Sequence, residues 1–142
     1  MKNLRSQSPV SNLLVLQLLT DRTTIDILNA VAAKVTSSND IKELLGLTPK
    51  QYYVRRSRLM EAGIIKRTRA KFTLTSFGQL TYQALVKIAK AFRHSRELVI
   101  IDTIKSIAGM PRNEQKDLIN NLNLDDEIKN YFLKHAQDSS SN

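Results

Sequence analysis

The stretch that decides the fold is residues 41–78, IKELLGLTPKQYYVRRSRLMEAGIIKRTRAKFTLTSFG. Within it, TPKQ at 48–51 combines a capping threonine, a proline suited to the first helical position and a glutamine that can complete a capping box. We therefore predict a helix that runs from Pro49 to Ala62. Gly63 is expected to end this helix, because glycine adopts the left-handed backbone of a helix C-terminus at little cost.

After the glycine, the period of the apolar residues changes from that of a helix to that of a strand. The alternation predicts two short strands, 64–69 and 71–75, joined at Ala70-Lys71. This turn contains neither glycine nor asparagine, so its type does not follow from the sequence.

Upstream, apolar residues recur at helical spacing, and TSSN at 36–39 supplies N-cap candidates for a short helix that stops at Gly46. The helices expected in this part are 10–20, 23–35 and 40–45. The short helix is expected to face the core with three apolar side chains: Ile41, Leu44 and Leu45.

Downstream, Ser76 and Gln79 form another capping-box pair that opens a long helix with an apolar stripe. This helix either continues to about Ile107 or breaks near His94-Ser95. Gly109 and Pro111 then mark a stop and a restart, and two further helices are expected at 112–122 and 125–136.

The positive charge is concentrated in one part of the chain. The formal net charge is +9, and the 25 residues from Thr48 to Phe72 carry +7 of it; the remaining residues include 14 basic and 12 acidic ones. A local basic patch on a nearly neutral body indicates a site for a polyanion. The alternative is a solvated surface that serves only solubility.

The order of these elements over residues 18–107 resembles that of a winged helix-turn-helix regulator. The chain is similar to the broad ArsR/MarR-like group, and more closely to small archaeal winged-helix regulators that carry QYY (51–53), an SRLMEAGII-like stretch (57–65) and a TSFG helix start (75–78). The resemblance implies a mainly α fold with a two-stranded β-hairpin wing. It also implies a cytoplasmic, DNA-binding transcriptional regulator.

In such domains the N-terminal half of the recognition helix contacts base edges in the major groove. We expect base contacts from Gln51, Tyr53 and Val54, and phosphate contacts from Thr48, Arg55 and Arg58. The wing would lie over the minor groove or the flanking backbone. The full set of residues expected at double-stranded DNA is Thr48, Lys50, Gln51, Tyr53, Val54, Arg55, Ser57, Arg58, Arg67, Arg69 and Lys71.

One residue departs from the family pattern, because Arg56 lies on the helix side otherwise formed by Tyr52, Leu59 and Ala62. Three roles are open to Arg56: its stem is buried while its charge reaches solvent, it pairs with Glu61, or it contacts a partner.

The helix after the wing is expected to mediate a homodimer, since two-fold pairing places two recognition helices one turn of DNA apart, about 34 Å. Its expected interface residues are Leu80, Leu85, Ile88, Phe92 and Val99. The alternative is that the stripe is covered by the C-terminal helices of the same chain. The predicted organisation is a flexible N-terminus (1–9), a winged helix-turn-helix domain (10–75), a long dimerisation helix (76–108), a C-terminal helical segment (109–136) and a disordered tail (137–142).

Several classes of function are not supported by the residues. The chain has no cysteine, and its two histidines lie 41 positions apart, so we expect no metal site and no cofactor. No nucleophile and base combination is visible, which argues against an enzyme. No apolar run is long enough to span a membrane. An effector, if there is one, would be organic. The alternative function is a winged-helix module that binds protein or RNA without reading a DNA sequence.

Overall fold

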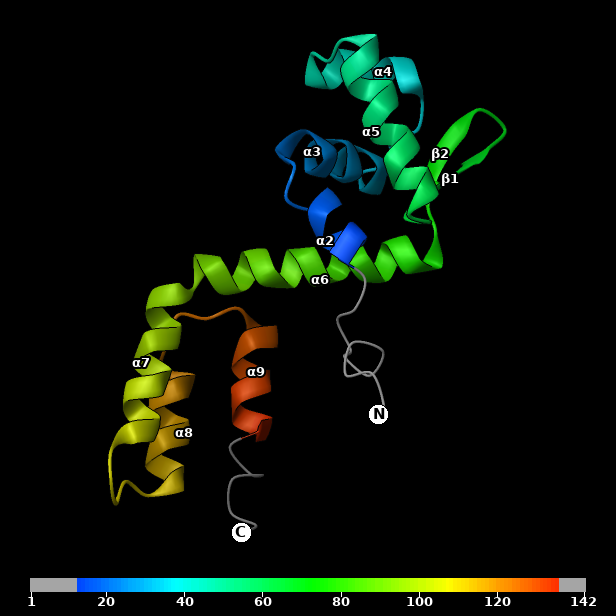
Figure 1. Cartoon of the computed structure of the whole chain (residues 1–142). Coiled ribbons are helices and arrows are strands. Elements are labelled where there is room, and N and C mark those ends of the chain that lie inside the picture. The colour runs from blue at the N-terminus through cyan, green and yellow to red at the C-terminus, as the bar shows by residue number, and fades with distance from the viewer. Residues whose placement is uncertain (1–12, 136–142) are drawn as a thin grey trace, which may run out of the picture. The chain divides into compact units, whose positions relative to one another are not determined.

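The computed structural model describes residues 13–135, so the predictions for 1–9 and 137–142 lie outside the described part. This part is mainly helical, with one two-stranded antiparallel sheet (Figure 1). It divides into two compact units between Ala84 and Leu85, within a helix. The elements are α2 (Leu13–Leu18), α3 (Arg22–Ala32), α4 (Ser38–Leu45), α5 (Pro49–Glu61), β1 (Ile65–Thr68), β2 (Lys71–Leu74), α6 (Ser76–Arg93), α7 (Ser95–Ser106), α8 (Arg112–Asn120) and α9 (Asp126–His135).

The first unit is built around α3, which contacts α4, α5 and β2 (Figure 1). Its core joins apolar side chains from every one of these elements, and such burial is the main force that stabilises the unit. The largest fully buried side chains are Tyr52, Phe72, Ile27, Leu28, Ile41, Leu59 and Ile64. The prediction that Leu44 faces this core is wrong, because its side chain is 64% exposed.

Helix α3 ends at Ala32, three residues before the predicted end. The next segment turns through Lys34, whose φ of 65° is left-handed. This early end brings the carbonyl of Thr36 next to the hairpin, where it accepts a hydrogen bond of 3.0 Å from the backbone N–H of Phe72. Backbone pairing with the hairpin therefore decides where the helix stops.

The hairpin is confirmed, but its turn lies one residue earlier than predicted. Thr68 pairs with Lys71, which leaves Arg69 and Ala70 as the two turn residues. Both have positive φ, 51° and 64°, as a type I′ turn requires at its two central positions. The right-handed twist of the strands selects this turn even though Arg and Ala adopt it at a cost.

The junction of the hairpin and α6 is organised by Thr75 rather than by the predicted capping residue Ser76. The Thr75 hydroxyl accepts a hydrogen bond of 2.9 Å from the N–H of Gly78 and donates to the carbonyl of Gly63. The N–H of Thr75 donates to the Ile64 carbonyl at 3.0 Å. The start of α6 is thus fastened to the end of α5 and the start of the hairpin.

The predicted helix 76–108 is two helices, because the chain breaks at His94 between α6 and α7. The break was one of the two alternatives, and burial favours it. Ile101 and Ile104 of α7 enter a core cluster together with Ile119, Leu124 and Ile128 from α8, α9 and the loop between them. The helices expected at 112–122 and 125–136 are confirmed as the slightly shorter α8 and α9.

Gly78 supplies a test of the junction. A Cβ added there would lie 1.9 Å from the Ile64 carbonyl oxygen, a backbone atom that cannot move alone. Gly78→Ala is therefore expected to lower the free energy of unfolding by about 3 kcal/mol, measured by urea denaturation of the full chain.

The exposed Gln83 of the same helix gives the control, and Gln83→Ala should change stability by less than about 0.5 kcal/mol. In open space, the better helix propensity of alanine would instead stabilise Gly78→Ala by about 1 kcal/mol. That result would contradict the close approach.

Candidate nucleic-acid interface

The start of α5 is fixed by the capping box that the sequence predicts. The Thr48 hydroxyl accepts a hydrogen bond of 3.2 Å from the Gln51 N–H, and the Gln51 side-chain oxygen accepts one of 3.0 Å from the Thr48 N–H. Gln51 therefore uses its oxygen to start the helix. Its amide NH₂ group is the part that can serve an outside partner.

Helix α5 has the two-sided character that the sequence predicts. Tyr52 and Leu59 are fully buried, and the Tyr52 hydroxyl donates a hydrogen bond of 3.0 Å to the hydroxyl of Ser38 in α4. This bond satisfies the one polar group of an otherwise apolar side chain. The exposed side of α5 carries Lys50, Gln51, Tyr53, Val54, Ser57 and Arg58.

Arg56 takes the place of an apolar residue because it is stacked among aromatic rings. Its guanidinium carbon lies 4.7 Å from the ring centre of Tyr53, 5.0 Å from that of Phe72 and 5.8 Å from that of Tyr52. Its Nε is buried and has no hydrogen-bond partner among the described residues. Of the three roles left open by the sequence, burial of the stem is the one closest to this arrangement.

Tyr53 is held between two cations on the surface of the first unit. The Lys42 Nζ lies 5.0 Å from its ring centre and donates a hydrogen bond of 3.4 Å to its hydroxyl, while Arg56 approaches the same ring. The ring also meets Tyr52 edge to face at 5.2 Å. Lys42 was not among the predicted site residues, since nothing in the sequence joins α4 to this position of α5.

Arg55 has a partner inside the protein. Its Nε lies 2.7 Å from the Asp21 carboxylate, and its Nη1 donates to the Gln51 carbonyl at 3.1 Å. Asp21 also caps α3 by accepting hydrogen bonds from the N–H and hydroxyl of Thr24. The hydrogen bond from Arg55, followed by that from the Thr24 hydroxyl, lowers the pKa of Asp21 to about 2. Arg55 thus ties α5 to the start of α3.

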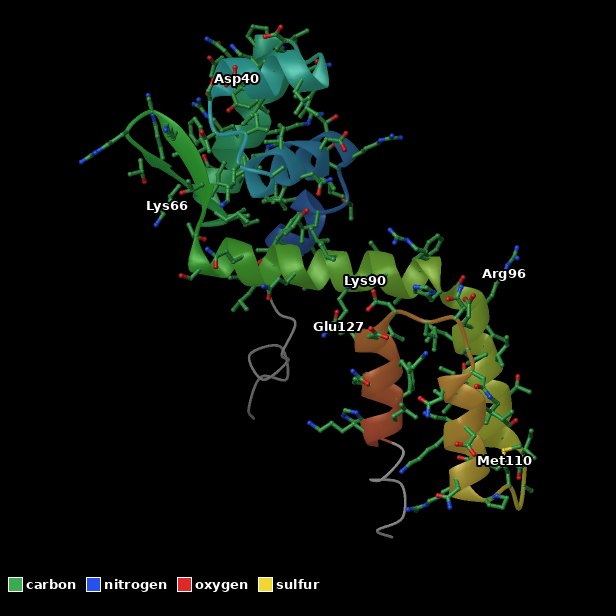
Figure 2. All side chains as sticks on the ribbon, turned by 180° about the vertical axis from the view of Figure 1, so that it is seen from behind. Asp40, Lys66, Lys90, Arg96, Met110 and Glu127 are labelled. Atoms are coloured by element: carbon green, nitrogen blue, oxygen red, sulfur yellow. The ribbon has the colours of Figure 1, made fainter. Side chains whose placement is uncertain are left out.

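The hairpin presents its cations to solvent, and Figure 2 labels Lys66 on β1. The exposed basic residues are Lys66, Arg67, Arg69 and Lys71. Arg67 pairs with Phe72 across the hairpin and lies on the same face, with its guanidinium 6.0 Å from the ring centre of Phe72. Arg69 occupies the strained turn, where its backbone adopts a conformation that usually favours glycine or asparagine.

The residues expected at a dimer interface fall into two groups. Leu80, Ile88 and Phe92 of α6 are 69%, 65% and 83% exposed, and Val99 of α7 is also largely exposed. Leu85 is only partly exposed. Ile104, which lies on the same predicted long helix, is buried against the C-terminal helices of its own chain. Ile104 is therefore covered by its own chain, whereas pairing of the exposed residues with a second copy stays a prediction.

Comparisons with known proteins add no identification: no family model, no curated protein and no solved structure matches the chain. Among residues 13–135, no group of three or more His, Asp or Glu side chains is placed to hold a metal ion. None of the helices in that range has the length and apolar composition needed to cross a membrane.

The Asp21–Arg55 pair predicts a difference between two proteins that depends on pH. Asp21→Asn keeps a capping side chain but removes the charge. Because the pKa of Asp21 is lowered from 3.8 to about 2, the pair stabilises the folded state above pH 3.8 and loses this effect as the pH falls through 2.

We expect the variant to be less stable by about 1 kcal/mol at pH 7, since both side chains are partly exposed and solvent screens the pair. This difference should vanish near pH 2. Urea unfolding of both proteins between pH 2 and 7 measures it. An unchanged difference across that range would show that the charge of Asp21 is not responsible.

Proposed function

We propose that the first unit is a winged helix-turn-helix domain that binds double-stranded DNA, with α5 in the major groove and β1–β2 as the wing. One observation carries the proposal. Eight basic residues lie between Lys50 and Lys71 on α5 and the hairpin, and only Arg55 forms an ion pair with a carboxylate of the described residues. Helix α5 contacts β1, so the two cationic elements belong to one body. Unpaired cations of this density favour a phosphate backbone.

The exposed side of α5 supplies the chemistry for base recognition. Lys50, Tyr53, Val54 and Ser57 offer a cation, a hydroxyl-bearing ring, an apolar surface for the thymine methyl and a second hydroxyl. Tyr53 is held by Lys42 and Arg56, which reduces the entropy that it would lose on contact. The N-terminus of α5 and Arg58 would hold phosphates.

The strained turn supports a role for the hairpin tip. A type I′ turn made of Asn-Gly would cost less than Arg69-Ala70, for which a left-handed backbone costs about 1–2 kcal/mol per residue. Local strain of this kind is expected where a side chain serves function rather than stability. We therefore assign Arg69, with Arg67 and Lys71, to the minor groove or the flanking backbone.

We further propose that two copies of the chain pair through α6. Leu80, Ile88 and Phe92 are separated by eight and four positions and so share one helix face, on which they remain strongly exposed. The other side of the helix carries Gln79, Lys90 and Arg93. A face of this kind is self-complementary under two-fold symmetry, because the same apolar residues meet across the axis. Such a dimer suits an operator with two half-sites.

The hairpin arginines provide the test of DNA binding. Replacing Arg67 and Arg69 together with Ala removes two phosphate contacts, so the slope of log affinity against log salt should become less negative by about one to two units. Fluorescence anisotropy with a labelled duplex of random sequence, at several salt concentrations, measures the slope. The matched control is Arg96→Ala with Arg112→Ala, which removes the same charge from exposed sites of the second unit.

The single variant Arg69→Gly separates binding from folding. It removes one cation and relieves the left-handed strain, so the thermal midpoint should rise while DNA affinity falls. Equal slopes for the wild type, the double variant and the control would contradict the proposed interface. Weak binding with no preferred sequence after selection from a random pool would instead favour a protein- or RNA-binding module.

The proposed dimer is tested by sedimentation velocity at micromolar concentration. The wild type should sediment as a dimer, and Leu80→Glu with Phe92→Glu should sediment as a monomer, because two charges would be buried at the interface. Gln79→Glu adds a charge to the other side of the helix and should leave the dimer intact. A monomeric wild type, or a dimeric double variant, would contradict pairing through this face.

A further inference from the structure

The second unit contains a cavity that the proposed DNA interface does not use. It has a volume of about 320 Å³ and lies between the end of α6, the start of α7 and the inner face of α9. Its walls are almost wholly apolar, and the side chains that form them are Ala91, Leu98, Ile128, Tyr131 and Phe132. Cavities that bind small molecules have volumes of about 300–1,000 Å³, so this one would take a short ligand.

The walls of the cavity are held in place by the core of the same unit. Ile128 belongs to the buried cluster, and Leu98 and Phe132 pack against it. Tyr131 and Phe132 meet edge to face, with ring centres 5.2 Å apart. The cavity therefore has a defined shape rather than being a gap between loose side chains.

Charged groups lie only at the rim, where α6 faces α9. Figure 2 shows Lys90 and Glu127 pointing toward one another from these two helices. The Glu127 carboxylate is shared by two lysines, since its oxygens lie 3.3 Å from the Lys87 Nζ and 3.4 Å from the Lys90 Nζ. Lys90 also lies 3.4 Å from the Asp125 carboxylate. These distances exceed the 2.7–2.9 Å of strong charge-assisted bonds.

The rim has more positive than negative charge. Lys87 and Lys90 face Glu127 at the cavity itself. Outside the lining, Asp125 lies beside Lys90. The Nζ of Lys105, also outside the lining, lies 4.9 Å from the ring centre of Phe132. Among the residues that line the cavity, two ammonium groups thus face one carboxylate. The carboxylates beside Lys90 raise its pKa, so this group stays charged at neutral pH.

Lys87 is the group best placed to receive a ligand. Its side chain is 68% exposed and has one carboxylate contact among the described residues, at 3.3 Å. An ammonium has three N–H donors, so two of them are free for a further acceptor. Lys87 also lines the cavity, and an acceptor bound to it would be continuous with an apolar group in the cavity.

We propose that this cavity binds an amphipathic monocarboxylate, with its apolar body between Leu98, Ile128 and Phe132 and its carboxylate on Lys87 and Lys90. The apolar walls suit the apolar part of the ligand, and the excess of ammonium groups at the rim suits a negatively charged head group. A cationic head would have to compete with two lysines for Glu127. The proposal rests on the second unit alone and holds whether or not the first unit binds DNA.

Three probes that share one alkyl chain and differ in the head group test the proposal: decanoate, decanol and decylammonium. Isothermal titration calorimetry of the full chain, below the concentrations at which the probes aggregate, should show saturable binding of decanoate. The dissociation constant of decanoate should be about tenfold lower than that of decanol. This ratio corresponds to the net free energy of one charge-assisted hydrogen bond. Decylammonium should bind more weakly than either.

Two variants locate the site. Lys87→Gln leaves an exposed polar residue, keeps the fold and should remove most of the preference for decanoate over decanol. Ala91→Phe fills the cavity and should abolish binding of both probes, with the thermal midpoint as a check that the protein is folded. Lys134→Gln changes an exposed lysine of α9 that does not line the cavity and should behave as the wild type.

Each other result would overturn the proposal. Equal binding of decanoate and decanol, or tighter binding of decylammonium, would show that the rim does not select an anion. Absence of saturable binding would show that the cavity takes no such ligand. An unchanged preference in Lys87→Gln would place the carboxylate elsewhere.

Discussion

The contact between α5 and the hairpin depends on the stacking of one guanidinium, that of Arg56, among aromatic rings of the two elements. Tyr52 and Tyr53 belong to α5, whereas Phe72 belongs to β2, and all three ring centres lie within 6 Å of the Arg56 guanidinium carbon. Removing a charge from water is costly unless another interaction offsets it, and the negative faces of aromatic rings do so here. This contact sets the hairpin against α5.

Around α5, several side chains that could contact a partner also stabilise the domain. Gln51 closes the capping box, and Arg55 joins α5 to Asp21 at the start of α3. Substitutions at these positions would alter folding as well as binding. The exposed residues Val54, Ser57 and Arg58 are free of such contacts, so changes there report more directly on a bound partner.

Local chemistry made much of this fold predictable from the sequence. The cap at Thr48, the glycine ends of helices, the burial of Tyr52 and the alternation of the hairpin all follow from neighbours within a few positions. The errors share a different origin. The exposure of Leu44 and the early end of α3 depend on elements distant in the sequence, and so does the pairing of Arg55 with Asp21, which no local pattern indicates. Among the candidate site residues, the sequence could not foresee Lys42 for the same reason.

The sequence alone determined where α5 begins, where the hairpin lies and where the positive charge gathers, because these properties belong to short stretches of chain. Only the tertiary structure decided which cations are free, since Arg55 finds Asp21 34 positions away. It also decided that the chain breaks at His94, where burial of Ile101 and Ile104 outweighs the continuity of a helix. The cavity at α9 required it as well, because a concave surface exists only once three helices have packed.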